Sequence, residues 1–345
     1  MDELFLGGFN DFQLMRRFLF WSLCFCLLFP VGLSSCDGSD SAAVIFGGTT
    51  GKLTWTLTED GVLTITGEGP MPDYRDGGTS ETPPWYPHVN RISSLTIGEG
   101  VTRIGDYAFM LCSFVTEVVI PESVTSMGDW AFWHCQSLKR ITFPDRMVRF
   151  GEWAFYENES LQSVCIPEGV TTIPSSAFAR CHNLTCVIMP GSLQTICGGA
   201  FSQCHKLTDV TIPDGVTVIE TGAFPSCTGL QEAYIGDGVT EIAAKAFAEC
   251  TALKTVVIGK SIQRIGDQAF NTRSSWDQMT LEKITVLFDD IASGSFPVLE
   301  SGSRGVFPKP GGWDLVSYKI YVPKGTKAEY QKNWSDYSSL IVEMQ

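Results

Sequence analysis

The sequence predicts an α/β repeat solenoid with a parallel sheet on one face, in which eight 23-residue coils lie between N- and C-terminal caps. Two observations support this prediction. An Ala-Phe pair recurs every 23 residues, with its phenylalanine at Phe109, Phe132, Phe155, Phe178, Phe201, Phe224, Phe247 and Phe270. Cysteine and leucine recur three and six residues after most of these phenylalanines. A unit of this length cannot bury its apolar columns alone, so stacked copies must share one continuous core.

Each repeat also predicts its local structure. Apolar residues alternate ahead of a proline, as in Val210 and Ile212, and a period of two is typical of a strand. The wider spacing of Val216 and Ile219 favours a short second strand or a turn, followed by a helical turn at Ala-Phe. Because parallel strands lie about 4.8 Å apart, such an array would be on the order of 40 Å long.

These columns resemble the BspA-type leucine-rich repeat family of bacterial surface proteins over residues 44–345. The resemblance includes the segment Lys52 to Tyr74 and the tail Lys319 to Met344. It implies a surface location and, for some members, adhesion to host proteins or other cells, with a partner that differs between members. The chain departs from better-known leucine-rich repeats because no asparagine ladder follows the strand. We therefore expect other hydrogen bonds to satisfy the turn.

An N-terminal β cap is predicted over residues 44–91, ahead of the solenoid at residues 92–287. Two alternating apolar runs, Leu53 to Leu57 and Val62 to Ile65, flank Glu59-Asp60-Gly61 and predict a β-hairpin.

Residues 288–345 are predicted to form a loop and a C-terminal cap. The apolar pattern resumes about five residues late after the last repeat phenylalanine, and a Gly/Ser/Pro-rich loop is expected over residues 292–312. Thr326 and Glu329 predict a capping box at the start of a short helix that closes the core.

Residues 1–35 predict a lipoprotein signal peptide. Two arginines precede an apolar run from Phe18 to Val31 that is too short for a comfortable bilayer span. The tetrapeptide Leu33-Ser34-Ser35-Cys36 resembles the bacterial lipobox, which implies cleavage before Cys36 and lipidation of its sulfur. Residues 36–43 are small and polar, and we interpret them as a tether.

The position of Met15, directly before the arginine pair, indicates that translation starts there. The lipid anchor predicts an exported protein in the outer membrane, at the cell surface of a Gram-negative bacterium. Asp37 and Asp40 are similar to surface-export signals of some such bacteria. An uncleaved transmembrane anchor is the alternative.

Composition and the absence of common catalytic motifs argue against several functions. The chain of 345 residues carries 24 basic and 38 acidic residues, so its formal net charge of -14 repels nucleic acid. It contains no HExxH, GxSxG or GxxxxGK[ST] sequence. We therefore predict neither an enzyme nor a cofactor.

The nine cysteines beyond Cys36 are interpreted as small buried hydrophobes. Stacked side chains lie about 4.8 Å apart, whereas the Cβ atoms of a disulfide lie about 3.8 Å apart. The sequence contains no CxxC pair, which argues against zinc. His182 and His205 share a column and predict a solvated pair rather than a metal site, because no third ligand repeats beside them.

Aromatic residues occupy two further columns, in the first three coils alone. The sequence predicts a ligand-binding aromatic ladder of Tyr107, Trp130, Trp133, Trp153 and Tyr156. Later coils place serine, glycine, lysine and glutamine two positions before the phenylalanine, so the repeat does not require aromatic residues there. Columns that accept glycine and lysine are expected at the surface, where aromatic clusters mark an interface. The alternative is that the N-terminal cap packs over the ladder through Trp55, Trp85 or Tyr86.

A second candidate face lies on the outward side of the long strands. Its residues vary while the inward columns stay fixed, which is typical of an adaptable binding surface but equally of unselected drift. They are Glu117, Arg140, Ile188, Asp209, Glu232 and Tyr234.

The leading functional hypothesis is a surface lipoprotein that binds a protein or a host or cell-surface ligand through a solenoid face. A glycan-binding lipoprotein is the runner-up, because sugar rings stack on the flat faces of the aromatic ladder. An enzyme would need converging acid, base and nucleophile groups, whereas the most constant columns are apolar.

Overall fold

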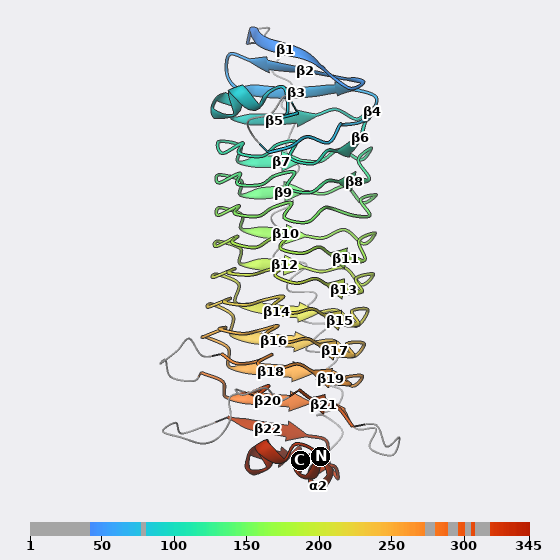
Figure 1. Cartoon of the computed structure of the whole chain (residues 1–345), viewed down its shortest axis with the longest axis vertical. Coiled ribbons are helices and arrows are strands. Elements are labelled where there is room, and N and C mark those ends of the chain that lie inside the picture. The colour runs from blue at the N-terminus through green and yellow to red at the C-terminus, as the bar shows by residue number, and fades with distance from the viewer. Residues whose placement is uncertain (1–41, 77–80, 273–279, 289–295, 301–304, 308–317) are drawn as a thin grey trace, which may run out of the picture. The chain divides into compact units, whose positions relative to one another are not determined.

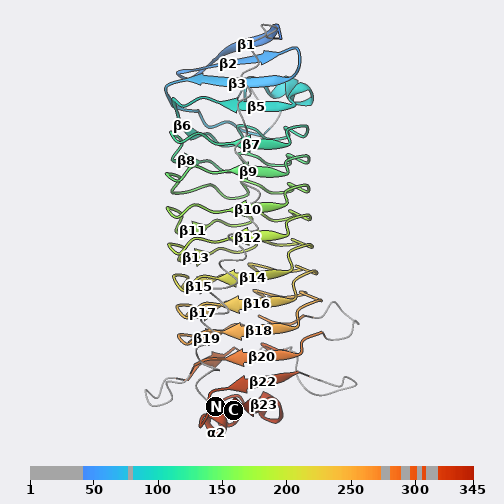
Figure 2. The same ribbon diagram turned by 180° about the vertical axis from the view of Figure 1, so that it is seen from behind.

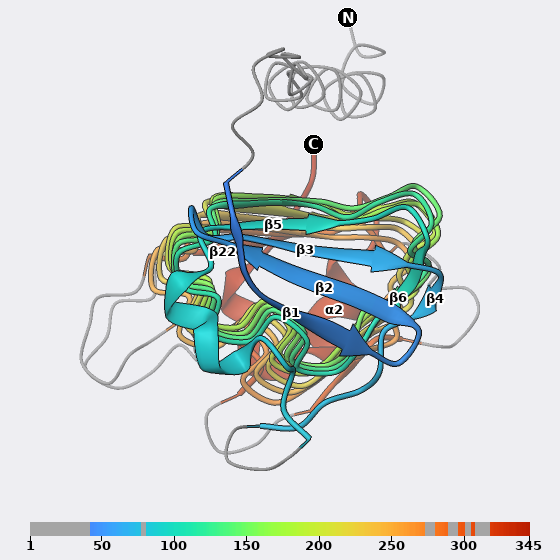
Figure 3. The same cartoon turned by 90° about the horizontal axis from the view of Figure 1, so that it is seen from above.

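Successive turns of the chain stack on one another with their long strands on one side (Figure 1). The computed structural model describes residues 42–76, 81–272, 280–288, 296–300, 305–307 and 318–345. Viewed along the stack, the coils superimpose closely (Figure 3). The predicted signal peptide and Cys36 lie outside the described residues. No helix among the described residues is long and apolar enough to cross a bilayer.

The first strand of each coil forms the predicted parallel sheet column. Between the repeat coils neighbouring strands pair in the 23-residue register, so that Asp209 lies opposite Glu232 and Ile212 opposite Ile235, while the spacing differs at both ends of the column. The column contains β3 (Val62–Gly67), β5 (Ser94–Ile97), β7 (Glu117–Val119), β9 (Arg140–Thr142), β10 (Ser163–Cys165), β12 (Cys186–Ile188), β14 (Asp209–Ile212), β16 (Glu232–Ile235), β18 (Thr255–Ile258), β20 (Lys283–Val286), β22 (Lys319–Val322) and β23 (Ile341–Glu343).

The wider-spaced segment forms a second column of short parallel strands, seen in Figure 2 beside the first. These strands are β4 (Gly69–Pro70), β6 (Val101–Ile104), β8 (Ser126–Met127), β11 (Thr172–Ile173), β13 (Thr195–Ile196), β15 (Val218–Ile219), β17 (Glu241–Ile242), β19 (Arg264–Ile265) and β21 (Val298–Leu299). Strand β21 lies within the stretch predicted as a loop. That prediction is wrong there, because Val298 pairs with Arg264 and extends the column.

The Ala-Phe segments of successive coils form a third column, held together by backbone hydrogen bonds. Each segment is a run of turns rather than the predicted helical turn. Three residues of this segment donate their backbone N–H groups to carbonyls of the next coil: the phenylalanine, the residue two positions before it and the residue two positions after it. Trp130, Phe132 and His134 do so at 3.0, 2.8 and 2.9 Å. The two outer residues have positive φ, 56° at Trp130 and 58° at His134. The first seven coils therefore contain left-handed backbone on both sides of the phenylalanine, and the eighth has it only before the phenylalanine, at Gln268.

The repeat phenylalanines form a column of rings through the core. Successive ring centroids lie 5.0 to 5.7 Å apart. The column extends beyond the repeated Ala-Phe pairs, since Trp85 stacks on Phe109 at 5.7 Å and Phe307 stacks on Phe270 at 5.5 Å. Each coil thus closes its neighbour's core, as a solenoid requires.

The cysteine column supplies hydrogen bonds that an asparagine ladder would otherwise make. The Cys135 thiol donates to the Phe109 carbonyl at 3.1 Å, and Cys181, Cys204, Cys227 and Cys250 make the same contact one coil after another. The predicted burial is confirmed for the six cysteines of this column and is wrong for Cys165, Cys186 and Cys197, which lie outside the column and are exposed or half-buried. Asn158, which replaces one cysteine, accepts the N–H of Cys135 at 2.7 Å.

The column cysteines are expected to resist alkylation in the native protein. Burial raises the pKa of the Cys112 thiol to about 12, and a buried thiol lacks both access and thiolate character. Cys165, on β10, is exposed. Peptide mass spectrometry after native treatment with iodoacetamide should find Cys165 modified well before Cys112. Equal rates without denaturant would contradict the burial.

The N-terminal cap contains the predicted hairpin and one further strand. Strands β2 (Leu53–Thr58) and β3 pair antiparallel, with Trp55 opposite Ile65. Strand β1 (Val44–Thr50), which the sequence did not reveal, pairs antiparallel with β2. A 3-10 helix, η1 (Tyr86–Arg91), leads into β5. Trp85 is fully buried and donates its indole N–H to the Ala108 carbonyl at 2.8 Å.

The C-terminal end resumes the repeat late, as predicted: Thr255 pairs with Lys283, five positions beyond the 23-residue register. The end contains α2 (Lys327–Asn333) and the 3-10 helix η3 (Ser335–Leu340). The predicted capping box is wrong, because the Thr326 hydroxyl donates to the Pro323 carbonyl at 2.6 Å and makes no cap hydrogen bond.

Three buried aromatic residues close this end. Tyr337 meets the ring of Phe307 edge-on at 5.5 Å and donates its hydroxyl to the Phe307 carbonyl at 3.0 Å. Tyr330 and Trp334 donate to the carbonyls of Phe288 and Pro297. The rings thus cover the core while their polar atoms are satisfied.

Candidate functional site

The structure brings the five residues of the aromatic ladder together on one flank. Tyr107, Trp130 and Trp153 stack with parallel rings, at centroid distances of 5.9 and 4.8 Å and an interplanar angle of 3° in both pairs. Trp133 meets Trp130 edge-on at 5.4 Å, and Tyr156 meets Trp153 edge-on at 4.9 Å. All five side chains are partly exposed.

The backbone explains which residues this column accepts. Tyr107, Trp130 and Trp153 have φ of 54°, 56° and 56°, in the left-handed region. A bulky residue there costs on the order of 1–3 kcal/mol, whereas glycine adopts it freely. Gly199 and Gly222 occupy the same position in later coils. Glycine in this column therefore reflects the backbone conformation as well as the surface position inferred from sequence.

The second aromatic column is partly exposed at most of its members and buried at two of them. Met110 and Ala179, which occupy it before and after the aromatic pair, are 1% and 3% exposed. Trp133 and Tyr156 are therefore larger than this position needs. The indole Nε1 of Trp133 has no hydrogen-bond partner among the described residues.

A polar network borders the ladder on one side, and sequence reasoning missed it. Glu157 accepts hydrogen bonds from Arg180 at 2.7 Å and lies 3.0 Å from Nδ1 of His134. Partial burial alone would raise the pKa of Glu157, but these hydrogen bonds outweigh burial and hold that pKa below its usual range. The Arg180 guanidinium also lies 5.6 Å over the Tyr156 ring. His134, Glu157 and Arg180 each lie two residues after a repeat phenylalanine, and this shared position was the signal available in the sequence.

A carboxylate column, Asp106, Asp129 and Glu152, borders the other side. Each carboxylate residue directly precedes a ladder residue. Oδ1 of Asp106 accepts the N–H of Asp129 at 3.1 Å, and Oδ1 of Asp129 accepts the N–H of Glu152 at 2.8 Å. Arg103 pairs with Asp73 and Asp106. No cation among the described residues pairs with Asp129 or Glu152.

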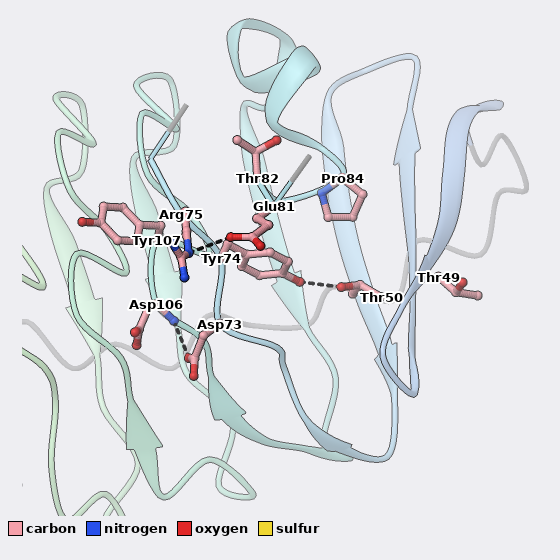
Figure 4. Close-up of a pocket in the computed structure, with 10 residues that line it drawn as sticks. All are labelled: Thr49, Thr50, Asp73, Tyr74, Arg75, Glu81, Thr82, Pro84, Asp106 and Tyr107. Carbon is pink, nitrogen blue, oxygen red and sulfur yellow. Dashed lines mark hydrogen bonds and ion pairs between the residues drawn. The ribbon is translucent and has the colours of Figure 1, made fainter. Parts of the chain in front are cut away.

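An open hollow of about 770 Å³ adjoins the Tyr107 end of the ladder, between the cap and the first coil (Figure 4). Tyr74 and Thr50 hydrogen-bond through their hydroxyls at 2.6 Å, and Arg75 pairs with Glu81 at 2.6 Å. Burial raises the pKa of Tyr74 to about 12, so this phenol stays neutral. The lining residues are Thr49, Thr50, Asp73, Tyr74, Arg75, Glu81, Thr82, Pro84, Asp106 and Tyr107.

Trp55 and Trp85 do not cover the aromatic ladder, which corrects that alternative. Trp85 packs between Trp55 and Phe109 inside the core. Among the described residues, no ring of the cap, Tyr86 included, contacts Tyr107, Trp130 or Trp153.

The second candidate face lies on the outer side of the long strands, in line with its sequence pattern. Glu117 and Arg140 are exposed and form an ion pair at 3.6 Å. Tyr234 donates its hydroxyl to Glu232 at 2.9 Å. Ile188 and Asp209 lie between these two pairs and are partly exposed. These side chains form local pairs and no convergent cluster.

The His182 and His205 rings stack in parallel at 4.7 Å on adjacent coils. Burial, followed by the neighbouring His205, lowers the pKa of His182. No group of three histidine, cysteine or acidic residues in the described part of the chain could hold a metal ion.

Comparison with known proteins identifies the repeat. The family model described as "BspA type Leucine rich repeat region" matches residues 86–208 and 194–296, in six copies. A leucine-rich repeat protein from Bacteroides ovatus is 22% identical, with a TM-score of 0.57, over 86% of this chain and 76% of that one. A leucine-rich repeat protein from Eubacterium ventriosum is 26% identical, with a TM-score of 0.48, over 72% of this chain and 73% of that one. No curated protein matches significantly.

Proposed function

Because the chain belongs to the family of BspA-type leucine-rich repeat proteins, we propose that it is an exported lipoprotein that binds a protein ligand through its aromatic ladder. The ligand belongs to a host or to another cell surface. Cys36 anchors the protein in the outer membrane, and the solenoid presents the ladder outside the cell. The function is binding and not catalysis.

One observation supports this proposal above the others. The first three coils keep tyrosine and tryptophan at left-handed backbone positions where the five later coils carry serine, glycine, lysine or glutamine. Later coils form the same backbone without aromatic side chains in this column, and a bulky residue at positive φ costs free energy. Tryptophan, tyrosine and arginine are also the residues that most often dominate the binding energy of protein interfaces. The neighbouring Arg180, held over Tyr156, adds the third residue type to the same flank.

Glycan binding is the second candidate function, and the hollow beside Tyr107 favours it. There an aromatic ring lies next to hydroxyl groups of Thr49, Thr50 and Tyr74 and to the carboxylate of Asp106. Stacking and polar groups of this kind together suit a sugar ring.

A triple variant tests the role of the aromatic ladder. Trp130→Ser, Trp133→Ala and Trp153→Gly introduce residue types that later coils already carry in these columns. The three rings are partly exposed, so their removal uncovers little of the core, and Trp153→Gly also relieves the left-handed strain at that position. We expect a nearly unchanged melting transition and at least about a tenfold loss of affinity, since interface anchors often supply 2 kcal/mol or more. Surface plasmon resonance against a panel of matrix proteins, beside a glycan array, measures the loss.

The double variant Arg140→Ala and Tyr234→Ala, on the second face, is the matched control and should bind normally. Binding lost in this control but kept in the triple variant would move the site to the outer sheet face. A marked fall in melting temperature of the triple variant without a binding defect would make the ladder structural.

A further inference from the structure

The aromatic ladder ends at Trp153. One face of this indole packs on Trp130 at 4.8 Å, and Tyr156 meets it edge-on. The same column continues with Ser176 and Gly199, which have no ring to stack. Among the described residues, no ring or cation lies against the opposite face of Trp153. That face is therefore available for a planar group at the level of the fourth coil.

The charge beside this face is negative. Glu152 directly precedes Trp153 and is exposed, and Asp129 lies one coil earlier in the carboxylate column. Arg149 lines the same hollow as both carboxylates but lies beyond ion-pair distance of either, and the nearby Arg103 and Arg180 are held by other carboxylates. The net charge of -14 adds to this local field. The end of the ladder therefore attracts cations and repels anions.

The chain already contains the matching arrangement with its own arginine. The Arg180 guanidinium lies over the Tyr156 ring and donates a hydrogen bond to Glu157, the next residue. Trp153 and Glu152 also combine a ring with an adjacent carboxylate, here on the residue before the ring, and no arginine of the described residues lies over this ring or pairs with this carboxylate. A guanidinium is planar and can stack and donate to a carboxylate at once, which a lysine ammonium cannot.

We propose that the free face of Trp153 and the carboxylate of Glu152 bind the guanidinium of an arginine side chain of the partner protein. The guanidinium stacks on Trp153 at the level of Ser176, as a fourth member of the ring stack. Its N–H groups donate hydrogen bonds to the Glu152 carboxylate. This inference rests on the proposed function, because it names the partner chemistry at the same site: a basic, arginine-bearing protein surface.

A variant that places an aromatic ring at position 176, and so covers the free face of Trp153, tests the inference. Ser176 has φ of 53°, close to the 56° of Trp153, so the indole of Ser176→Trp should stack on Trp153 and cover its face. The probe is an acetylated and amidated arginine hexapeptide, titrated into the full chain in detergent by calorimetry. We expect about a tenfold loss of affinity in this variant, in line with a desolvated cation–π contact.

Gln268→Trp is the matched control, because it adds a tryptophan in the same column at φ of 58° but four coils away. It should bind the peptide as the unmodified protein does. Thermal unfolding of both variants establishes that each is folded.

A second variant tests the role of the Glu152 carboxylate without adding a ring. Glu152→Gln should weaken binding by about fivefold through loss of the charge-assisted hydrogen bond. Glu168→Gln removes an equal charge from an exposed residue after β10 and should have no effect. A lysine hexapeptide should bind the unmodified protein about tenfold more weakly than the arginine peptide.

Equal affinity of the arginine peptide for Ser176→Trp and the unmodified protein would overturn the inference, as would equal binding of lysine and arginine peptides. Binding of a neutral glucan hexasaccharide that Ser176→Trp abolishes, without arginine binding, would also overturn it, in favour of a sugar ring. If the triple ladder variant still loses its matrix-protein ligand in these cases, the proposed function stands and this inference alone fails.

Discussion

Replacing Phe201 by alanine is expected to lower the free energy of unfolding by about 3–5 kcal/mol. Phe201 is fully buried, and its ring lies 5.5 Å from Phe178 and 5.0 Å from Phe224. The substitution removes a rung from the middle of the ring column and leaves a cavity between two rigid neighbours. Coils above and below cannot close it, because three ladders of hydrogen bonds fix their spacing. Denaturant unfolding followed by circular dichroism measures the loss.

Phe114→Ala is the matched control for this prediction. Phe114 is 56% exposed, so the same chemical change should alter stability by less than about 0.5 kcal/mol. A loss below about 1 kcal/mol for Phe201→Ala would mean that its ring does not support the core.

Replacing Cys36 by alanine is expected to release the protein from the membrane fraction. Lipidation needs the thiol of this residue, and several acyl chains on one cysteine give durable anchoring. In the unmodified protein, intact mass should show the cleaved and acylated form. In the variant, the protein should appear in the soluble fraction, without the mass of the acyl chains.

Cys165→Ala, which alters an exposed cysteine of the solenoid, should leave membrane attachment unchanged. If the Cys36→Ala protein stays in membranes with an unchanged mass, the lipobox interpretation is wrong. A transmembrane anchor would then explain the attachment.

The strands that the sequence predicted best are those with the simplest periodicity. Alternation in Val210 and Ile212 places both side chains inside, and a fixed period of 23 residues sets the register of the strand pairs within the repeats. Both signals lie in the chain itself, so no contact had to be known. The late resumption at Lys283 was visible for the same reason. Strand β21 and the Phe307 rung were not, because each lies outside the period and finds its place only by packing on the coil before it.

The candidate site divides in a similar way. The sequence determined which aromatic residues share a flank, because equal spacing in successive coils puts Tyr107, Trp130 and Trp153 in one column. The left-handed backbone of that column followed from no residue pattern, since tryptophan and glycine occupy it alike.

The sequence by itself determined the solenoid, the register of its coils and the grouping of the aromatic ladder, because these follow from repetition. Only the tertiary structure decided the backbone conformation and the hydrogen bonds of each column. Backbone N–H groups that must point at the next coil impose positive φ beside the phenylalanine, and the cysteine thiols bond the preceding coil. It also decided that Trp85 closes the core instead of covering the ladder, because the end of the ring column offered a fully buried surface. Such choices depend on which groups a neighbouring coil leaves unsatisfied or uncovered, and that is a property of the stack.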